Sequence, residues 1–365
     1  MTARFRTFLS TDLKTFGVTT ALFWLIEAFY FGPKRNSTRS RNLLVDKNND
    51  DVNRIEPKND FKYKPVPLFY DSSMNDNDNE YKEQLGTMID IAHKCGEMML
   101  SFVGCGIETK TNRIDFVTEC DIEIQRFIFS ELRKKYPEYG YIGEEEDESS
   151  PKLEPVKVHE GFIFIVDPID GTTNFVHKFP FSCVSIALTM NDEPKVGVVF
   201  NPYTDEMFIA VKGCGSFRNT DRIKVTNKTK LSESMLAYEV GYDRDEGKLS
   251  TIFTTIQRVL SVGQPHGVRM MGSAVLDLCY LACGQIDCLY SGVAGEGWKV
   301  WDHAAGSLLV TEAGGVIASC RKEEPWTIYS DNIVAAASKE LLEQLQELVK
   351  PPTDFFRRVS YRFNF

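Results

Sequence analysis

The 365-residue sequence lacks the signatures of several common enzyme and binding classes. No glycine-rich loop ends in Gly-Lys-Ser or Gly-Lys-Thr, the ending that a P-loop requires. The five histidines show no close metal-ligand spacing, and the nine cysteines, an odd number, show no metal-finger spacing. We therefore expect reduced and mostly buried thiols. A compact basic patch is also missing, and the net charge of −10 argues against a nucleic-acid partner.

The most informative segment that is present runs from Asp167 to Phe175 and reads Asp-Pro-Ile-Asp-Gly-Thr-Thr-Asn-Phe. It follows the apolar run 162–166, which is typical of a fully buried strand, and Pro168 is expected to end the strand's ladder. Asp167 and Asp170 then emerge at the carboxyl end of the strand, where their charges repel unless a cation neutralises them. The amides that follow can cradle a phosphate at a helix start. The segment predicts a metal and phosphate site, with a surface Asx turn as the alternative.

Other phosphatase chemistries fit these residues poorly. Cys120 and Arg126 have the spacing of a thiolate phosphatase, but the residues between them are acidic and helix-like and include no glycine. Such a segment cannot form an anion cradle and would raise the pKa of the thiol. Asp167 and Asp170 are three positions apart, whereas an aspartyl-phosphate nucleophile is expected two positions from its partner.

Two further segments strengthen the prediction of a metal site. Residues 141–146 read Tyr-Ile-Gly-Glu-Glu-Glu, a short apolar stretch that breaks at a glycine into acids. Alone, this acidic run is typical of a solvated loop. Residues 301–306 read Trp-Asp-His-Ala-Ala-Gly and open an apolar helix that stops at a glycine pair, 314–315. Asp302 stands where the N-cap of that helix is expected.

Together the three segments resemble the signatures of the inositol monophosphatase family, in the family's order. The resemblance covers about residues 81–345, with supporting strings at 179–181, 197–202 and 311–315. It implies a fold, an activity and a set of site residues.

The resemblance assigns a role to each of several residues. It implies Mg²⁺ ligands at Glu144, Asp167, Asp170, Asp302 and the backbone carbonyl of Ile169. It places Lys110 near the metal, Asp121 and Thr172 as the pair that orients the attacking water, and Gly171 and Thr172 as phosphate-binding amides, with Glu145 acting indirectly. Oxygen-only ligands agree with a hard cation such as Mg²⁺. The reaction implied is in-line hydrolysis of a phosphate monoester, without a phospho-enzyme.

Substrate choice is less sharply encoded. The segment 269–274 resembles the part of the family that contacts the inositol ring, which makes Gly272 and Ala274 candidate ring contacts. Glu296 is the only acid in a long, glycine-rich loop, 290–300, that precedes Asp302. Tyr242 stands where the family commonly has a serine. Inositol monophosphate is the substrate that the motifs favour; a bisphosphate nucleotide, another sugar phosphate, or a binding protein without turnover are the alternatives.

The hydrophobic patterns predict an α/β fold, and the resemblance implies a layered sandwich of helices and sheets that forms a homodimer. Helices are expected at 81–102, 121–135, 250–260, 273–283 and 339–349, and strands at 162–166, 183–190 and 195–201.

The chain is expected to contain one catalytic domain, at 81–349, with flanking segments. Residues 1–35 include an apolar stretch, 16–32, that is interrupted by Glu27 and is shorter than the about 20 residues of a membrane span. An uncleaved membrane anchor, a targeting peptide, an interfacial helix and a wrongly predicted first exon remain open for it, so a cytoplasmic location and a membrane-anchored one are both compatible with the sequence. Residues 36–80 have the composition of a disordered linker, and 350–365 form a tail.

Overall fold

The computed structural model describes residues 80–102, 107–109, 116–145, 160–295 and 297–350. Its larger sheet has seven strands, in the order in which they occur along the chain. All neighbouring strands in it are antiparallel except the first pair, which is parallel. The strands are β3 (Gly140–Gly143), β4 (Phe162–Asp170), β5 (Cys183–Met190), β6 (Glu193–Asn201), β7 (Glu206–Val211), β8 (Gly215–Arg218) and β9 (Asp221–Ile223).

Both faces of this sheet are buried, which explains the continuous apolar sequence of β4. Side chains alternate between the two faces of a strand. Ile163 and Ile165 belong to one hydrophobic cluster, whereas Phe164 and Val166 belong to the cluster on the opposite face. A strand of this kind requires a layer of helices on each side.

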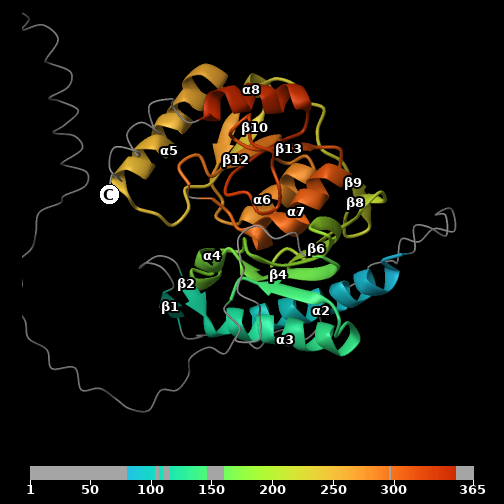
Figure 1. Ribbon diagram of the computed structural model, residues 1–365. Coiled ribbons are helices and arrows are strands. Elements are labelled where there is room, and N and C mark those ends of the chain that lie inside the picture. The colour runs from blue at the N-terminus through green and yellow to red at the C-terminus, as the bar shows by residue number, and fades with distance from the viewer. Residues whose placement is uncertain (1–79, 103–106, 110–115, 146–159, 296, 351–365) are drawn as a thin grey trace, which may run out of the picture. The chain divides into compact units, whose positions relative to one another are not determined.

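The first helical layer consists of α2 (Lys82–Ser101) and α3 (Glu119–Lys135), which pack against β4, β5 and β6. Figure 1 shows these two helices along the same side of β4. Thr118 and Asp121 form a capping box that starts α3 two residues before the expected helix. A small two-stranded sheet, β1 (Ile107–Thr109) with β2 (Phe116–Thr118), precedes that helix.

The second helical layer consists of α6 (Ala274–Ala282) and α7 (Val300–Glu312), on the other face of the large sheet. Glycines allow close approach here. A Cβ atom on Gly197 of β6 would lie 3.0 Å from the carbonyl oxygen of Ala305 in α7. One on Gly306 would lie 2.5 Å from Leu278 of α6. Strand β6 therefore packs against the backbone of α7, and α7 packs against a side chain of α6.

A five-stranded sheet follows, and its order is β11-β10-β12-β14-β13. Its inner face shares the cluster that contains α6 and α7, and its outer face packs with α5 (Glu246–Arg258) and α8 (Lys339–Val349). The described residues therefore alternate helices, sheet, helices, sheet and helices (Figure 1). The strands are β10 (Met235–Tyr238), β11 (Gly267–Arg269), β12 (Cys288–Ser291), β13 (Val316–Ala318) and β14 (Ile333–Ala336).

The α/β layered fold and the predicted helices and strands are confirmed, with small shifts at their ends. Helix α5 begins four residues before the expected 250–260 segment and passes into a π-helical turn, η3 (Val259–Gly263). The strands that follow β6 were not anticipated. The eight described cysteines are all free thiols, and six of them are buried. Within the described ranges, no helix has both the length and the apolar character of a membrane span; the 16–32 stretch lies outside them.

Candidate active site

Strand β4 positions the first two aspartates through a bulge. Asp167 pairs with Ser185 of β5 and Asp170 pairs with Cys183, and the register shifts between the two pairs. The prediction that Pro168 ends the ladder was wrong, because β4 continues to Asp170. Pro168 has no N–H to donate, and a bulge is one of the few positions inside a sheet that tolerates it.

The structure brings three of the predicted ligands together. Asp167, Asp170 and Asp302 each offer a carboxylate oxygen, and these oxygens lie within 4.8 Å of one another. Asp167 is 2% exposed, and its Oδ1 atom is buried without a hydrogen-bond partner among the described residues. Burial raises the pKa of Asp167 well above its ordinary value, and the charges of Glu144, Asp170 and Asp302 raise it further. An oxygen-only cluster with an unpartnered buried atom fits a hard divalent cation.

Asp170 is held by the first turn of α6. The Ser273 hydroxyl donates to Asp170 Oδ2, and the amides of Ala274 and Val275 donate to Oδ1 and Oδ2 at 3.2 and 3.0 Å. Burial raises the pKa of Asp170 to about 6, although these three hydrogen bonds oppose the rise because they favour the charged form. The aspartate therefore has a fixed orientation and is ionised at neutral pH.

Asp302 lies inside α7, not at its N-cap as expected. The helix begins at Val300, and Asp302 Oδ2 reaches back to accept the amide of Lys299 at 2.5 Å. Desolvation and the nearby charge of Asp170 raise the pKa of Asp302 well above its ordinary value, while the Lys299 amide opposes that rise. The sequence could not give this register, because the helix takes in two residues that precede the aspartate.

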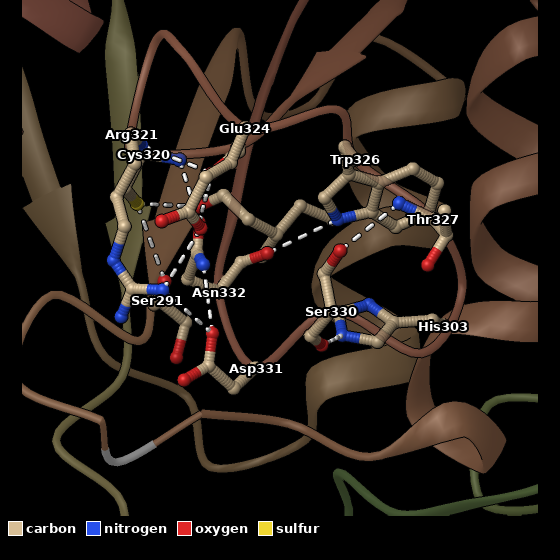
Figure 2. A network of polar contacts seen from close by, with 12 residues as sticks. Ser291, His303, Cys320, Arg321, Glu324, Trp326, Thr327, Ser330, Asp331 and Asn332 are labelled. Atoms are coloured by element: carbon tan, nitrogen blue, oxygen red, sulfur yellow. Dashed lines mark hydrogen bonds and ion pairs between the residues drawn. The ribbon is translucent and has the colours of Figure 1, made fainter. Parts of the chain in front are cut away.

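The residue after Asp302 anchors α7 to the segment that precedes β14. His303 is fully buried, and its Nε2 atom lies 3.1 Å from the carbonyl oxygen of Ser330. Figure 2 shows His303 next to Trp326, whose indole N–H donates to the carbonyl of Asn332 at 3.0 Å. Burial lowers the pKa of His303 to about 4, so the ring is neutral at physiological pH. His303 thus packs against Trp326 and joins α7 to this segment.

The acidic loop after β3 is held by a side chain that sequence reasoning missed. The amide of Glu144 donates to Val166 of β4 at 3.2 Å. Gln125 of α3 accepts the amide of Glu145 at 2.9 Å and donates to the Glu145 carbonyl at 2.8 Å. A Cβ atom on Gly143 would lie 2.2 Å from Gln125, so the glycine is needed for this approach. That glycine was the one sequence signal for the contact.

The predicted water-orienting pair is in contact. Thr172 Oγ1 lies 3.3 Å from Asp121 Oδ1 and 3.1 Å from the carbonyl oxygen of Ile169. The other carboxylate oxygen of Asp121 accepts the amide of Thr118 at 2.9 Å and also the Thr118 hydroxyl. The capping box of α3 thus leaves one oxygen of Asp121 directed at Thr172. Thr118 is a further residue that the sequence analysis did not identify.

The turn after β4 requires glycine for two reasons. Gly171 has φ +83°, and a Cβ atom there would lie 3.0 Å from the carbonyl oxygens of both Phe181 and Gly272. It precedes α4 (Thr172–Val176), a short helix that begins where a helix start was expected. Asn174 of this helix donates its side-chain amide to the carbonyls of Phe181 and Met271 at 2.8 and 2.7 Å. The motif is therefore joined to the 271–273 loop.

The predicted ring contacts are less directly placed. The amide of Gly272 donates to Glu239 at 2.8 Å, and the amide of Ala274 donates to Asp170, so both N–H groups already hold carboxylates. Their role toward a substrate stays a prediction. Lys110 and Glu296 lie outside the described residues. Sequence reasoning did not single out Glu239, Ser273 or Asn174, since each acts on a segment far away in the chain.

Comparison with known proteins agrees with this geometry. The model of the inositol monophosphatase family matches residues 80–351. An inositol monophosphatase of Mesembryanthemum crystallinum is 41% identical over 236 residues, which are 64% of this chain and 84% of that protein. Inositol monophosphatase 1 of Solanum lycopersicum is 38% identical over 274 residues, 74% of this chain and 95% of that protein.

Solved structures give the same result. The extragenic suppressor protein suhB of Bartonella henselae is 30% identical, with a TM-score of 0.63 over 73% of this chain and 98% of that one. The inositol monophosphatase of Thermotoga maritima is 29% identical, with a TM-score of 0.62 over 73% and 96%. The family match, the relatives and the carboxylate cluster lead to one conclusion: this chain belongs to the inositol monophosphatase family.

Proposed function

We propose that this protein is an Mg²⁺-dependent phosphatase that releases phosphate from inositol monophosphate. The observation that carries the proposal is the convergence of Asp167, Asp170 and Asp302 within 4.8 Å, beside the hydrogen-bonded pair of Thr172 and Asp121. The names of the related inositol monophosphatases support the substrate. A protein that only bound phosphate would have no need for the second feature.

The same three aspartates, with Glu144 and the carbonyl of Ile169, are the proposed metal ligands. When bound there, Mg²⁺ would lower the pKa of a water and neutralise charge on the leaving oxygen. The protein's part is to hold the ligands in place. The first turn of α6 orients Asp170, and the Lys299 amide orients Asp302.

Thr172 and Asp121 are proposed to orient the attacking water. With the Ile169 carbonyl bound to the metal, the Thr172 hydroxyl would donate its proton to Asp121 Oδ1 instead of to that carbonyl. A lone pair of Thr172 Oγ1 would then accept a hydrogen bond from the water. The water is thereby aligned for in-line attack at phosphorus, and the proton has a path to Asp121. The proposed phosphate contacts are Lys110 and the amides of Gly171 and Thr172. The proposed contacts to the inositol ring are Gly272, Ala274 and Glu296.

The test is phosphate release by the full-length protein with and without Mg²⁺. Inositol monophosphate, adenosine 3′,5′-bisphosphate and fructose bisphosphate are offered at equal concentration, with Asp170→Asn as the control. We expect inositol monophosphate to have the highest kcat/KM and all turnover to need the metal. A higher kcat/KM for another ester would replace the substrate but keep the chemistry; no turnover of any ester would contradict the proposal.

We further propose a cytoplasmic homodimer whose catalytic unit is 81–349, with 36–80 as a linker and 350–365 as a tail. Sedimentation of the purified protein tests the dimer. Cell fractionation of the full chain and of a variant without residues 1–35 tests the location. A full chain found in the membrane fraction, and released by that deletion, would favour the anchored alternative instead.

A further inference from the structure

The loop Met271–Ser273 joins the five-stranded sheet to the catalytic carboxylates. It follows β11 and leads directly into α6, whose first residues hold Asp170. Gly272 in this loop has φ +76°, a backbone conformation that residues other than glycine rarely adopt. A loop with no strand or helix of its own needs other contacts to keep one conformation.

Glu239 supplies those contacts on one side. It comes directly after β10, and its Oε1 atom accepts the amides of both Met271 and Gly272 at 2.8 Å each. Two amides on one carboxylate oxygen fix the direction of both peptide groups, and hydrogen bonds to a charged acceptor are about twice as strong as neutral ones. Glu239 therefore sets the orientation of the loop relative to the five-stranded sheet.

Asn174 holds the same loop from the other side. Its side-chain amide donates to the carbonyl of Met271 at 2.7 Å, and it belongs to the helix that carries Thr172. The amides of the loop thus face one sheet, and its Met271 carbonyl faces the catalytic motif. Loss of either partner would free the loop on that side.

Asp277 is a second buried acid that interacts with Glu239. Asp277 is fully buried in α6, and neither of its carboxyl oxygens is hydrogen-bonded within the described part of the chain. Burial raises the pKa of Asp277 well above its ordinary value, and the charge of Glu239 raises it further. Burial also raises the pKa of Glu239, but the two loop amides oppose that rise. The buried pair thus disfavours two charges at once, while the two loop amides favour the ionised form of Glu239.

We infer that Glu239 is a positioning residue for the substrate: it fixes the loop Met271–Ser273, and through it the polyol side of the substrate pocket. This inference rests on the proposed function, because it concerns the same site. The inference predicts that loss of Glu239 changes KM more than kcat, and that it does so only for some substrates. An ester with a hydroxylated ring depends on the loop, whereas a small ester without a ring depends mainly on the metal and on Thr172.

The test compares Glu239→Ala and Glu239→Gln with a matched control, Glu312→Ala. Glu312 of α7 also accepts two backbone amides, that of Gly213 in the turn between β7 and β8 at 2.9 Å and that of Gly215 at the start of β8 at 3.0 Å. Glu312→Ala therefore also removes a carboxylate that holds a loop, but this loop does not contact the proposed catalytic residues. Glutamine retains an oxygen that can accept both amides.

We expect Glu239→Ala to raise KM for inositol monophosphate about 10-fold, to lower kcat less than about 3-fold, and to leave KM for glycerol 2-phosphate nearly unchanged. Glu239→Gln should restore KM, and Glu312→Ala should not alter it. Hydrogen exchange in full-length protein provides a readout without turnover, with the amides of Met271 and Gly272 exchanging faster in Glu239→Ala alone.

Three results would overturn the inference. The first is an unchanged KM together with unchanged exchange at Met271 and Gly272. The second is an equal KM effect on both esters, and the third an equal effect of Glu312→Ala. Wild-type protein that fails to hydrolyse inositol monophosphate would instead show that the proposed function is wrong, and the exchange data would then report on the loop alone.

Discussion

The turn at the end of β4 and the loop that enters α6 contribute to one site in different ways. The turn carries its chemistry within a few consecutive residues: Asp167, Asp170 and Thr172 lie on one strand end and the helix that follows it. The loop carries little chemistry of its own and is defined by distant partners, namely Glu239 and Asn174. The proposed reactive groups are thus encoded locally, while their orientation is encoded by long-range contacts.

Asp170→Asn breaks the turn at the point where both regions meet, and we expect the largest effect there. The substitution removes one negative charge from the carboxylate cluster but keeps the shape of the side chain. We expect kcat/KM to fall by at least about 1000-fold, because metal chemistry supplies most of the acceleration. Steady-state phosphate release measures it, and circular dichroism checks that the fold is retained. Activity close to wild type would show that Asp170 is not a metal ligand.

Thr172→Ala tests the chemistry of the turn without touching the carboxylate cluster. The hydroxyl that joins Asp121 to the proposed water is lost, and we expect kcat to fall about 100-fold with little change in the Mg²⁺ requirement. Asp121→Asn and the double variant complete a cycle. If the two residues act as a unit, the double variant should be hardly worse than either single one. Additive losses would contradict the proposed pair.

The free energy of unfolding of the metal-free protein should depend on pH through the aspartates of the cluster. The pKa of Asp170 is raised to about 6, so between pH 4 and 6 the folded state keeps a proton that the unfolded state has lost. Stability from this group is therefore present at low pH and is lost as the pH rises from about 4 to about 6, by about 3 kcal/mol in all. Asp167 and Asp302, whose pKa values are also raised, act in the same direction.

Denaturant unfolding with EDTA, at pH 4.5 and pH 7.5, measures this term as the difference between wild type and Asp170→Asn. The free energy of unfolding of wild type, relative to that of Asp170→Asn, should be lower at pH 7.5 than at pH 4.5. Added Mg²⁺ should reverse the shift, since the metal binds the ionised carboxylates. A difference that does not depend on pH would mean that Asp170 is not perturbed in the folded protein.

The contrast between the two regions also explains what could be predicted from the sequence. The apolar run before Asp167 and the order of Asp, Gly and Thr after it were enough to predict a buried strand that ends in a metal site. The bulge at Pro168 was not predictable, because it depends on the register with β5. Nor was Glu239, which lies 32 positions before Met271 and contacts it only because β10 and β11 are neighbours. Asp302 was predicted as a metal ligand, but its position inside α7 was not predicted.

Ser273→Ala sharpens the comparison with the smallest expected effect, because Ser273 belongs to the loop but acts on the turn. Its hydroxyl donates to Asp170, and loss of that bond should raise the pKa of the carboxyl further and lower its affinity for a cation. We expect the Mg²⁺ concentration for half-maximal activity to rise about 10-fold, with most of the loss recovered at saturating metal.

Ser273 also caps α6 through the Leu276 amide, so the same substitution also weakens the start of that helix. Ser338→Ala removes the equivalent cap of α8 and controls for this, since it should reduce stability by about 1 kcal/mol and leave the Mg²⁺ dependence as in wild type. An equal Mg²⁺ response in both variants would mean that the Ser273 hydroxyl serves the helix alone, and that the amides of Ala274 and Val275 are sufficient to orient Asp170.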